Sequence, residues 1–373
     1  MARRKHGEGS VFPRKDGRWV AQIRLENGKH KQSYHKTEKE AQVALRKMLH
    51  EQEQGTLVTA KQQTLKAYLE KWMEQVQKSR LRIGTYDLYC RIIKRHIVPA
   101  LGFIPLQRLT PEKIESFYAD KLEEGLSESS VRRIHAILHV ALKKAVRWGL
   151  VSKNVCDFVD APVTKEREMT VLTQEQAKKL LELASKHKLE AILTVALATG
   201  MREGELIALR WQDIDFNSKS LQVIRSRRRI NGLGPVETKP KTAKGKRKIT
   251  LPAFAIEALQ KHHERQQEKR AKLGSKWKET DAVFTNFHGG YLEANNLLRD
   301  FKKLLERVGL PKMRFHDLRH STATILFSMG VHPKVVQELL GHSNITVTLN
   351  IYSHVLPSIQ QEAMDKLDGL FGE

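Results

Sequence analysis

The sequence predicts a multidomain, mainly α protein, and three observations support this prediction. The chain has 373 residues, which exceeds one typical domain and favours two or three. Apolar residues alternate near the N-terminus and recur at helical spacing through most of the remaining chain. A strand-like region at residues 221–251 interrupts the helices of the second half. We therefore expect a small N-terminal three-stranded sheet plus helix, a helical bundle, and an α-rich C-terminal domain with a small antiparallel β-hairpin or sheet.

The N-terminal part predicts the sheet and its helix. Residues 8–35 predict three short strands, because every second residue from Trp19 to Leu25 is apolar and Gly-containing turns flank this run. Thr37 and Glu40 then form a capping-box pattern ahead of apolar residues at helical spacing. The first predicted domain comprises residues 1–58.

The middle part predicts four helices in a second domain, residues 62–160. Thr110 and Pro111 suit the N-cap and first turn of one helix, and residues 128–148 carry an apolar stripe at helical spacing. A charged stretch at residues 161–169 predicts a linker. The third predicted domain comprises residues 168–373, and within it the strand-like runs 221–229 and 246–251 predict the hairpin.

The composition indicates a polyanionic partner. Lysine and arginine exceed the acidic residues, giving a formal net charge of +24, and nucleic acid is the best match for such an excess. No run of about 18 apolar residues or signal-type segment is present, so no membrane association is expected. Cys90 and Cys156 are far apart and predict neither a disulfide framework nor a zinc ribbon. These features fit a reducing cytoplasm.

Basic residues on the polar faces of the predicted elements are expected to contact DNA phosphates. The candidates are Arg18, Arg24, Lys29, Lys31, Arg80, Arg82, Arg91, Arg132, Arg133, Lys239 and Lys244.

Five residues of the second half lie in short contexts that suit phosphate chemistry. They are Arg202 after Thr-Gly-Met, His316 and Arg319 in His-Asp-Leu-Arg-His, His342 in Leu-Gly-His-Ser, and Tyr352 ten residues later. Arginine grips two phosphate oxygens and keeps its proton, so Arg202 and Arg319 suit a phosphodiester whose charge grows in the transition state. A tyrosine can attack phosphorus, although forming its phenolate at pH 7 costs about 4 kcal/mol.

Two neighbouring residues are expected to support this set. Glu205 follows Arg202 by three residues on the same predicted helix face, where it can orient the guanidinium or form a simple helix ion pair. His316 and His320 have a spacing that can bind zinc. We expect no metal, because the glutamate of the zinc-protease motif and a suitable third ligand are missing, and we expect His320 to be a structural histidine.

Taken together, these motifs resemble the active site of a tyrosine recombinase of the phage integrase family, and the N-terminal module resembles the arm-binding domain of many integrases. The resemblance implies six catalytic residues, namely Arg202, Lys241, His316, Arg319, His342 and Tyr352. Tyr352 would be the nucleophile and form a 3′-phosphotyrosyl link, and Lys241 would protonate the leaving 5′ oxygen. Lys239, Lys244 and Lys246 crowd the same turn and leave the lysine assignment open.

The resemblance also implies the partners of the chain. These are double-stranded DNA with core and arm attachment sites, a homotetramer on two duplexes, an excision or directionality factor, and a host DNA-bending protein. No cofactor is expected, and the DNA would be that of a prophage or a conjugative transposon. The amphipathic spacing after Tyr352 predicts a C-terminal helix that packs on its own domain or on a neighbouring protomer.

Three alternatives stay open. A type IB topoisomerase would use the same residue types to nick and reseal one duplex. A DNA-binding regulator with an inactive site is the alternative from another class. A metal-dependent nuclease would need clustered carboxylates, and Asp213, Asp215 and Asp317 are the candidates.

Overall fold

A computed structural model describes residues 9–25, 28–54, 57, 62–164, 169–230, 232–238, 245–352, 364–365, 368 and 370–371. The chain divides into two compact units, Met1–Glu166 and Arg167–Glu373, and each is described by itself. No helix in the described part of the chain is long and apolar enough to cross a membrane.

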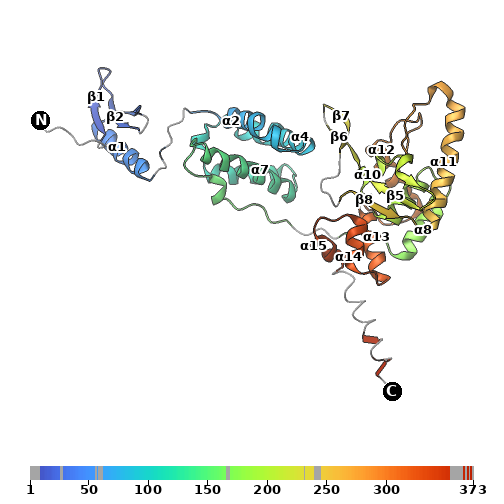
Figure 1. Cartoon of the computed structure of the whole chain (residues 1–373). Helices are drawn as coiled ribbons and strands as arrows, with labels where there is room; N and C mark the ends of the chain where they lie inside the picture. The colour runs from blue at the N-terminus through green and yellow to red at the C-terminus, as the bar shows by residue number, and fades with distance from the viewer. Residues whose placement is uncertain are drawn as a thin grey trace. The chain divides into compact units, whose positions relative to one another are not determined.

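The first unit begins with the predicted sheet and helix (Figure 1). Strands β1 (Ser10–Pro13), β2 (Trp19–Arg24) and β3 (His30–His35) form an antiparallel sheet in the order β1-β2-β3. Helix α1 (Glu38–Glu53) follows, and Thr37 and Glu40 form its capping box as predicted. Ala21 and Ile23 of β2 pack with Ala41 and Met48 of α1 in a small core.

The rest of the first unit is helical. One long helical segment contains α2 (Leu65–Trp72), a π-helical turn (Met73–Gln77) and α3 (Lys78–Arg80). A second contains α4 (Ile83–Ile92), another π-helical turn (Ile93–Ile97) and α5 (Val98–Leu101). After the 3₁₀ turn Leu106–Arg108 come α6 (Pro111–Glu123), α7 (Glu128–Arg147) and a 3₁₀ turn (Val155–Phe158). Their apolar faces share one core around Leu65, Trp72 and Ile137, as the helical spacing predicts.

The second unit is built around one apolar helix, α9 (Glu190–Thr199), which packs against α8 (Gln174–Ala184), α11 (Ala253–Leu273) and α13 (Asp317–Ser328). A helix that is apolar on every side needs such cover. Three further helices are α10 (Glu203–Ile207), α12 (Ala294–Val308) and α14 (Pro333–Leu340), and α15 (Ile345–Tyr352) follows them. Two 3₁₀ turns, Trp211–Asp213 and Gly274–Lys276, complete the described helical elements. The amphipathic tail predicted after Tyr352 lies mostly outside the described residues.

The strands of the second unit differ from the predicted hairpin. The run 221–229 is two strands, not one, which are β5 (Ser220–Val223) and β6 (Ser226–Ile230). Strand β5 lies between β4 (Ile214–Asp215) and β8 (Arg247–Thr250), while β6 pairs with β7 (Gly234–Thr238). The run breaks beside Arg225, whose guanidinium bonds to Asp213 at 2.8 Å. The division of the chain into three domains at 1–58, 62–160 and 168–373 stays a prediction.

Candidate active site

Arg202 lies at the turn between α9 and α10. Helix α9 ends at Gly200, which adopts a left-handed conformation with φ of 58°, a geometry that glycine adopts without strain. Arg202 is the N-cap of α10, and its side chain is 40% exposed. Its Nη1 donates to Glu205 Oε1 at 2.9 Å, and its Nη2 donates to the Gly341 carbonyl at 3.3 Å. The guanidinium is therefore held on one side and remains accessible on the other.

Glu205 is buried between arginines. It is 4% exposed, and its Oε2 accepts from the Arg202 backbone N–H at 3.1 Å and from Arg247 Nη2 at 2.9 Å. Burial favours the neutral acid, but Arg247 and Arg202 outweigh burial and lower the pKa of this carboxyl. Glu205 is therefore an ionised group that pairs with Arg202, as both alternatives predicted from the sequence require, and its orienting role stays a prediction.

Arg319 lies deeper in the site, on α13, and is only 2% exposed. Its Nη1 donates to the Gly200 carbonyl at 2.7 Å, whereas its buried Nη2 has no hydrogen-bond partner among the described residues. Burial, with repulsion from Arg202 and Arg247, lowers the pKa of Arg319 to about 9, so it remains protonated at pH 7. A buried N–H on a charged group calls for an acceptor. An anion between Arg202 and Arg319 would supply one.

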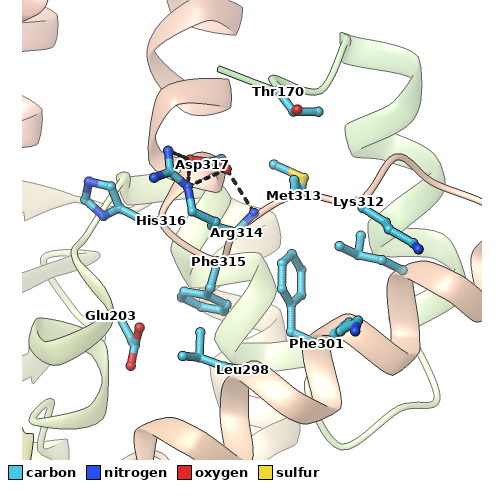
Figure 2. Close-up of a pocket in the computed structure, with 12 residues that line it drawn as sticks. Thr170, Glu203, Leu298, Phe301, Lys312, Met313, Arg314, Phe315, His316 and Asp317 are labelled. Atoms are coloured by element: carbon cyan, nitrogen blue, oxygen red, sulfur yellow. Dashed lines mark hydrogen bonds and ion pairs between the residues drawn. The ribbon is translucent and has the colours of Figure 1, made fainter. Parts of the chain in front are cut away.

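His316 is the N-cap of α13 and His320 lies in its first turn, and their ring centroids are 5.3 Å apart. His316 lines an open cavity of about 530 Å³ with Glu203, Phe301 and Phe315 (Figure 2). Partial burial, with repulsion from His320 and the site arginines, lowers the pKa of His316 to about 4. His316 is therefore neutral at pH 7 and open to a ligand, while His320 has a buried Nδ1 without a hydrogen-bond partner among the described residues.

His342 follows the left-handed Gly341 that ends α14 and is 7% exposed. Its Nδ1 hydrogen-bonds with the Thr348 hydroxyl at 2.8 Å, and Thr348 is fully buried on α15. Burial and the positive charge of Arg319 and Arg202 lower the pKa of His342 to about 3. The contact with Thr348 fixes the ring and leaves Nε2 as the nitrogen for a ligand. It also joins His342 to the helix that ends at Tyr352.

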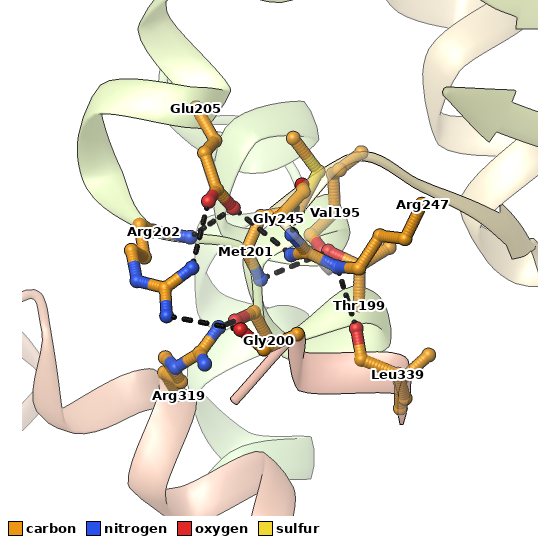
Figure 3. A network of polar contacts seen from close by, with 11 residues as sticks. Val195, Thr199, Gly200, Met201, Arg202, Glu205, Gly245, Arg247, Arg319 and Leu339 are labelled. Carbon is orange, nitrogen blue, oxygen red and sulfur yellow. Dashed lines mark hydrogen bonds and ion pairs between the residues drawn. The ribbon is translucent and has the colours of Figure 1, made fainter. Parts of the chain in front are cut away.

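Two residues of this network, Arg247 and Thr348, are absent from the sequence prediction. Arg247 is the first residue of β8, and Figure 3 shows its guanidinium beside Glu205 and Leu339. Nothing in the local sequence separates it from its neighbours Lys246 and Lys248. Thr348 likewise stands in an ordinary helical segment, so its role depends on a contact with His342 that only the tertiary structure creates.

Lys239, Lys241 and Lys244 lie outside the described residues. The structure describes the backbone of Tyr352, which is the last residue of α15.

The predicted DNA-contacting residues of the first unit are mostly exposed. Seven of them, Arg18, Arg24, Lys29, Arg80, Arg82, Arg132 and Arg133, are exposed, as is Arg91, which pairs with Asp87. Lys31 differs, because it lies opposite Ile23 in the sheet register and is partly buried. Burial lowers the pKa of Lys31, while Glu51 of α1 opposes that effect. Lys31 therefore lies on the helix-covered face of the sheet, the face on which Ile23 packs with α1.

The arrangement of charges defines the class of site. Arg202, Arg247 and Arg319 contribute three guanidinium groups around a single carboxylate, that of Glu205. In the part of the chain that the structure describes, no three His, Cys, Asp or Glu side chains gather as metal ligands. Asp317 instead pairs with Arg314 at 2.8 Å. An uncompensated cationic cluster flanked by neutral histidines is typical of an enzyme that acts on a phosphodiester.

Comparisons with known proteins agree with this class. Residues 170–358 match the model of the phage integrase family, and residues 64–122 match the N-terminal SAM-like domain of phage integrases. A tyrosine recombinase XerC-like protein of Caldanaerobacter subterraneus subsp. tengcongensis is 33% identical, covering 93% of this chain and 94% of its own. The ICEBs1 integrase of Bacillus subtilis is 30% identical over 75% of this chain and 76% of its own.

Solved structures share the fold. The Tn1549 transposon integrase in complex with a circular intermediate DNA has a TM-score of 0.69 at 24% identity, covering 82% of this chain and 99% of that one. A lambda integrase dimer bound to a COC′ core site has a TM-score of 0.58 at 20% identity, covering 94% and 96%.

The chain belongs to the phage integrase family. It is a site-specific tyrosine recombinase, a DNA-binding enzyme that breaks and rejoins DNA. The resemblance in the sequence is thereby confirmed at the level of family and activity, while the roles of individual residues stay predictions.

Proposed function

We propose that residues 170–352 cleave one DNA strand through Tyr352. The Tyr352 hydroxyl attacks the scissile phosphorus, the phenolic proton leaves, and the bond from phosphorus to the 5′ oxygen breaks. The products are a 3′-phosphotyrosyl link and a 5′ hydroxyl, and attack by a 5′ hydroxyl of the partner duplex reverses the reaction. Because the phosphotyrosine conserves the bond energy, the chemistry needs no nucleotide cofactor.

The observation that carries this proposal is the buried Nη2 of Arg319, which has no hydrogen-bond partner among the described residues, together with the partly exposed guanidinium of Arg202. Two guanidinium groups gripping the non-bridging oxygens would stabilise the charge that grows in the transition state. Glu205 would hold Arg202 in place for this task, through its bond at 2.9 Å. Forming the Tyr352 phenolate costs about 4 kcal/mol at pH 7, which such a cluster can offset.

The histidines would donate hydrogen bonds to the phosphate, and a lysine would donate a proton to the leaving group. His316 and His342 are neutral at pH 7 because the pKa of each is lowered, so each has one N–H to donate to a phosphate oxygen. A bound phosphate would raise both pKa values. Lys241 would donate its proton to the leaving 5′ oxygen, and His320 would support His316.

The remaining parts would hold the DNA. Residues 1–58 would bind an arm attachment site. Residues 62–160 and 168–373 would together bind a core attachment site. Exposed Arg18, Arg24 and Lys29 would contact the arm site, and Arg80, Arg82, Arg91, Arg132 and Arg133 the core site, with Lys239 and Lys244. Lys31 is the least suited to this role, because it lies on the covered face. Lambda integrase has been crystallised as a tetramer bound to a Holliday junction, and a homotetramer on DNA is proposed here.

The DNA would be a prophage or a conjugative transposon, whose excision would involve a directionality factor and a host DNA-bending protein. The relatives include the ICEBs1 integrase and the Tn916 transposase of Enterococcus faecalis. Topoisomerase-like resealing of one duplex and a catalytically inactive regulator are the alternatives to this proposal, and each predicts a different outcome in a cleavage assay.

The test is a suicide-substrate assay with nicked duplexes that carry candidate attachment sites, in the presence of a chelator. Wild type should form a covalent protein–DNA adduct, and Tyr352→Phe should bind the same DNA without forming it. Joining of the adduct to a second duplex would distinguish recombination from resealing. An adduct that persists in Tyr352→Phe would show that another residue is the nucleophile, and binding without an adduct on authentic sites would favour an inactive regulator.

A further inference from the structure

Arg247 connects three parts of the catalytic unit. Its Nη2 donates to Glu205 Oε2 at 2.9 Å, its Nε donates to the Leu339 carbonyl at 2.7 Å, and its Nη1 donates to the Gly245 carbonyl at 3.4 Å (Figure 3). Leu339 is the penultimate residue of α14, where the last carbonyls of a helix need partners from outside it. Gly245 is the first described residue after the lysine-rich turn.

These contacts close a ring around the site. Arg202 bonds to Glu205, Glu205 bonds to Arg247, and Arg247 bonds to the Leu339 carbonyl. Two residues further, the Gly341 carbonyl accepts from Arg202 at 3.3 Å and completes the ring. The ring joins the turn before α10, the first residue of β8 and the end of α14. His342 follows Gly341 directly, so the ring also fixes the position of the His342 backbone.

Arg247 is poorly suited to bind the phosphate itself. Its side chain is 7% exposed, and each of its three nitrogens already donates to a protein oxygen. Arg202 and Arg319 differ in this respect, since the first is 40% exposed and the second has an Nη2 without an acceptor among the described residues. Every nitrogen of the Arg247 guanidinium group is therefore already hydrogen-bonded within the protein.

We propose that Arg247 is a positioning residue that aligns Arg202, through Glu205, with His342, through the end of α14, before DNA binds. This inference rests on the proposed function, because it assumes that Arg202 and His342 act on the scissile phosphate. Pre-alignment matters for rate, since a misplacement of about 1 Å in a catalytic group costs ~100-fold. The position of Arg247, six residues after Lys241 in the chain, extends the same alignment to the strand that follows the proposed catalytic lysine.

The test compares Arg247→Met and Arg247→Lys with a matched control, Arg225→Met. Arg225 is also largely buried and pairs with carboxylates, those of Asp213 at 2.8 Å and Glu237 at 3.7 Å, but it makes no bond to the ring. For each full-length variant, three quantities are measured: the melting temperature, the Kd for a core-site duplex, and the single-turnover rate of adduct formation at saturating DNA. The rate is measured on a phosphodiester substrate and on one with a neutral methylphosphonate at the scissile position.

We expect Arg247→Met to form adduct ~100-fold more slowly at saturating DNA, with its Kd changed less than about 3-fold. The deficit should shrink to ~10-fold or less on the methylphosphonate, because a neutral centre depends less on aligned guanidinium groups. Arg247→Lys keeps the charge and one donor, so its rate should lie between those of wild type and Arg247→Met. Arg225→Met should keep the wild-type rate even where its melting temperature falls.

Four outcomes would overturn the proposal. They are a wild-type rate in folded Arg247→Met, a loss of DNA affinity that accounts for the whole defect, an equal deficit on both substrates, and an equal rate loss in Arg225→Met. If Arg247→Met does not fold, a wild-type rate in Arg247→Lys would contradict the proposal instead. All of these leave the Tyr352-dependent adduct of the wild type intact. Its absence on authentic sites would overturn the proposed function, and this inference with it.

Discussion

Replacing Glu205 by glutamine should destabilise the catalytic unit strongly, although the two side chains have the same shape. Glu205 is 4% exposed and accepts three hydrogen bonds, two from Arg202 and one from Arg247. The amide nitrogen of glutamine is a hydrogen-bond donor, so at one of these contacts it would face an arginine N–H, which is also a donor. It would also leave Arg247, which is 7% exposed, without its carboxylate. Removing the charge of one partner of a buried ion pair costs about 3–5 kcal/mol, because the other charge stays buried without compensation. Because Arg202 is partly exposed, we expect about 3 kcal/mol.

Native-state hydrogen exchange can measure this loss in the full-length protein. Amides of α9 in increasing urea report the free energy of unfolding of the unit that contains them, and wild type and Glu205→Gln would be compared at pH 7. Glu203→Gln is the matched control, since Glu203 is the neighbouring acid and burial raises its pKa. Removing its charge should cost less than ~0.5 kcal/mol or stabilise slightly. A loss below ~1 kcal/mol in Glu205→Gln, or an equal loss in Glu203→Gln, would refute the reasoning.

Three further predictions concern other parts of the account. Thr348→Val should slow adduct formation ~10–100-fold at saturating DNA, the range seen when a metal-binding histidine loses the hydrogen-bond partner that orients its ring. Thr346→Val, at an exposed position of the same helix, should keep the wild-type rate. Equal rates in the two variants would exclude a role for the His342–Thr348 bond. The lowered pKa of His342, about 3, means that its contribution to stability is complete above pH ~6.5 and is lost as the unfolded chain takes up a proton below it. His342→Gln should therefore lose ~2 kcal/mol less than wild type between pH 6.5 and 5 in urea titrations, and parallel curves would contradict the shift. Finally, log K for DNA should fall with log salt at a slope of roughly −7 if about 8 phosphates are neutralised per protomer; a slope near −2 would show that most basic faces point away from DNA.

The core of the site follows from local sequence rules. Gly200 and Gly341 each adopt the left-handed conformation that ends a helix, and each places a carbonyl where a site arginine donates to it. The short motifs around Arg202 and His342 therefore contain both the helix-ending glycines and the predicted site residues. The capping box at Thr37 predicted the start of α1 for the same reason, because the signal lies within four residues.

The parts that sequence could not supply depend on contacts between separate elements. Arg247 bonds to Leu339, 92 residues away, and Thr348 of α15 bonds to His342, which follows α14. No periodicity or motif marks either residue. The face of the sheet on which Lys31 lies is likewise set by its register, because it pairs opposite Ile23, on the face that packs on α1. The run 221–229 broke into two strands beside Arg225, whose partner Asp213 lies in another element.

The central claim is that Tyr352 carries the DNA after cleavage. The most direct measurement is mass spectrometry of the covalent adduct formed by wild type on a nicked attachment-site duplex, after digestion with nuclease and trypsin. Tryptic cleavage after Lys334 and Lys366 gives a peptide in which Tyr352 is the single tyrosine. The account predicts a residual nucleotide on this peptide, with fragment ions that place it on Tyr352. A nucleotide on any other residue, or on any other peptide, would contradict the account.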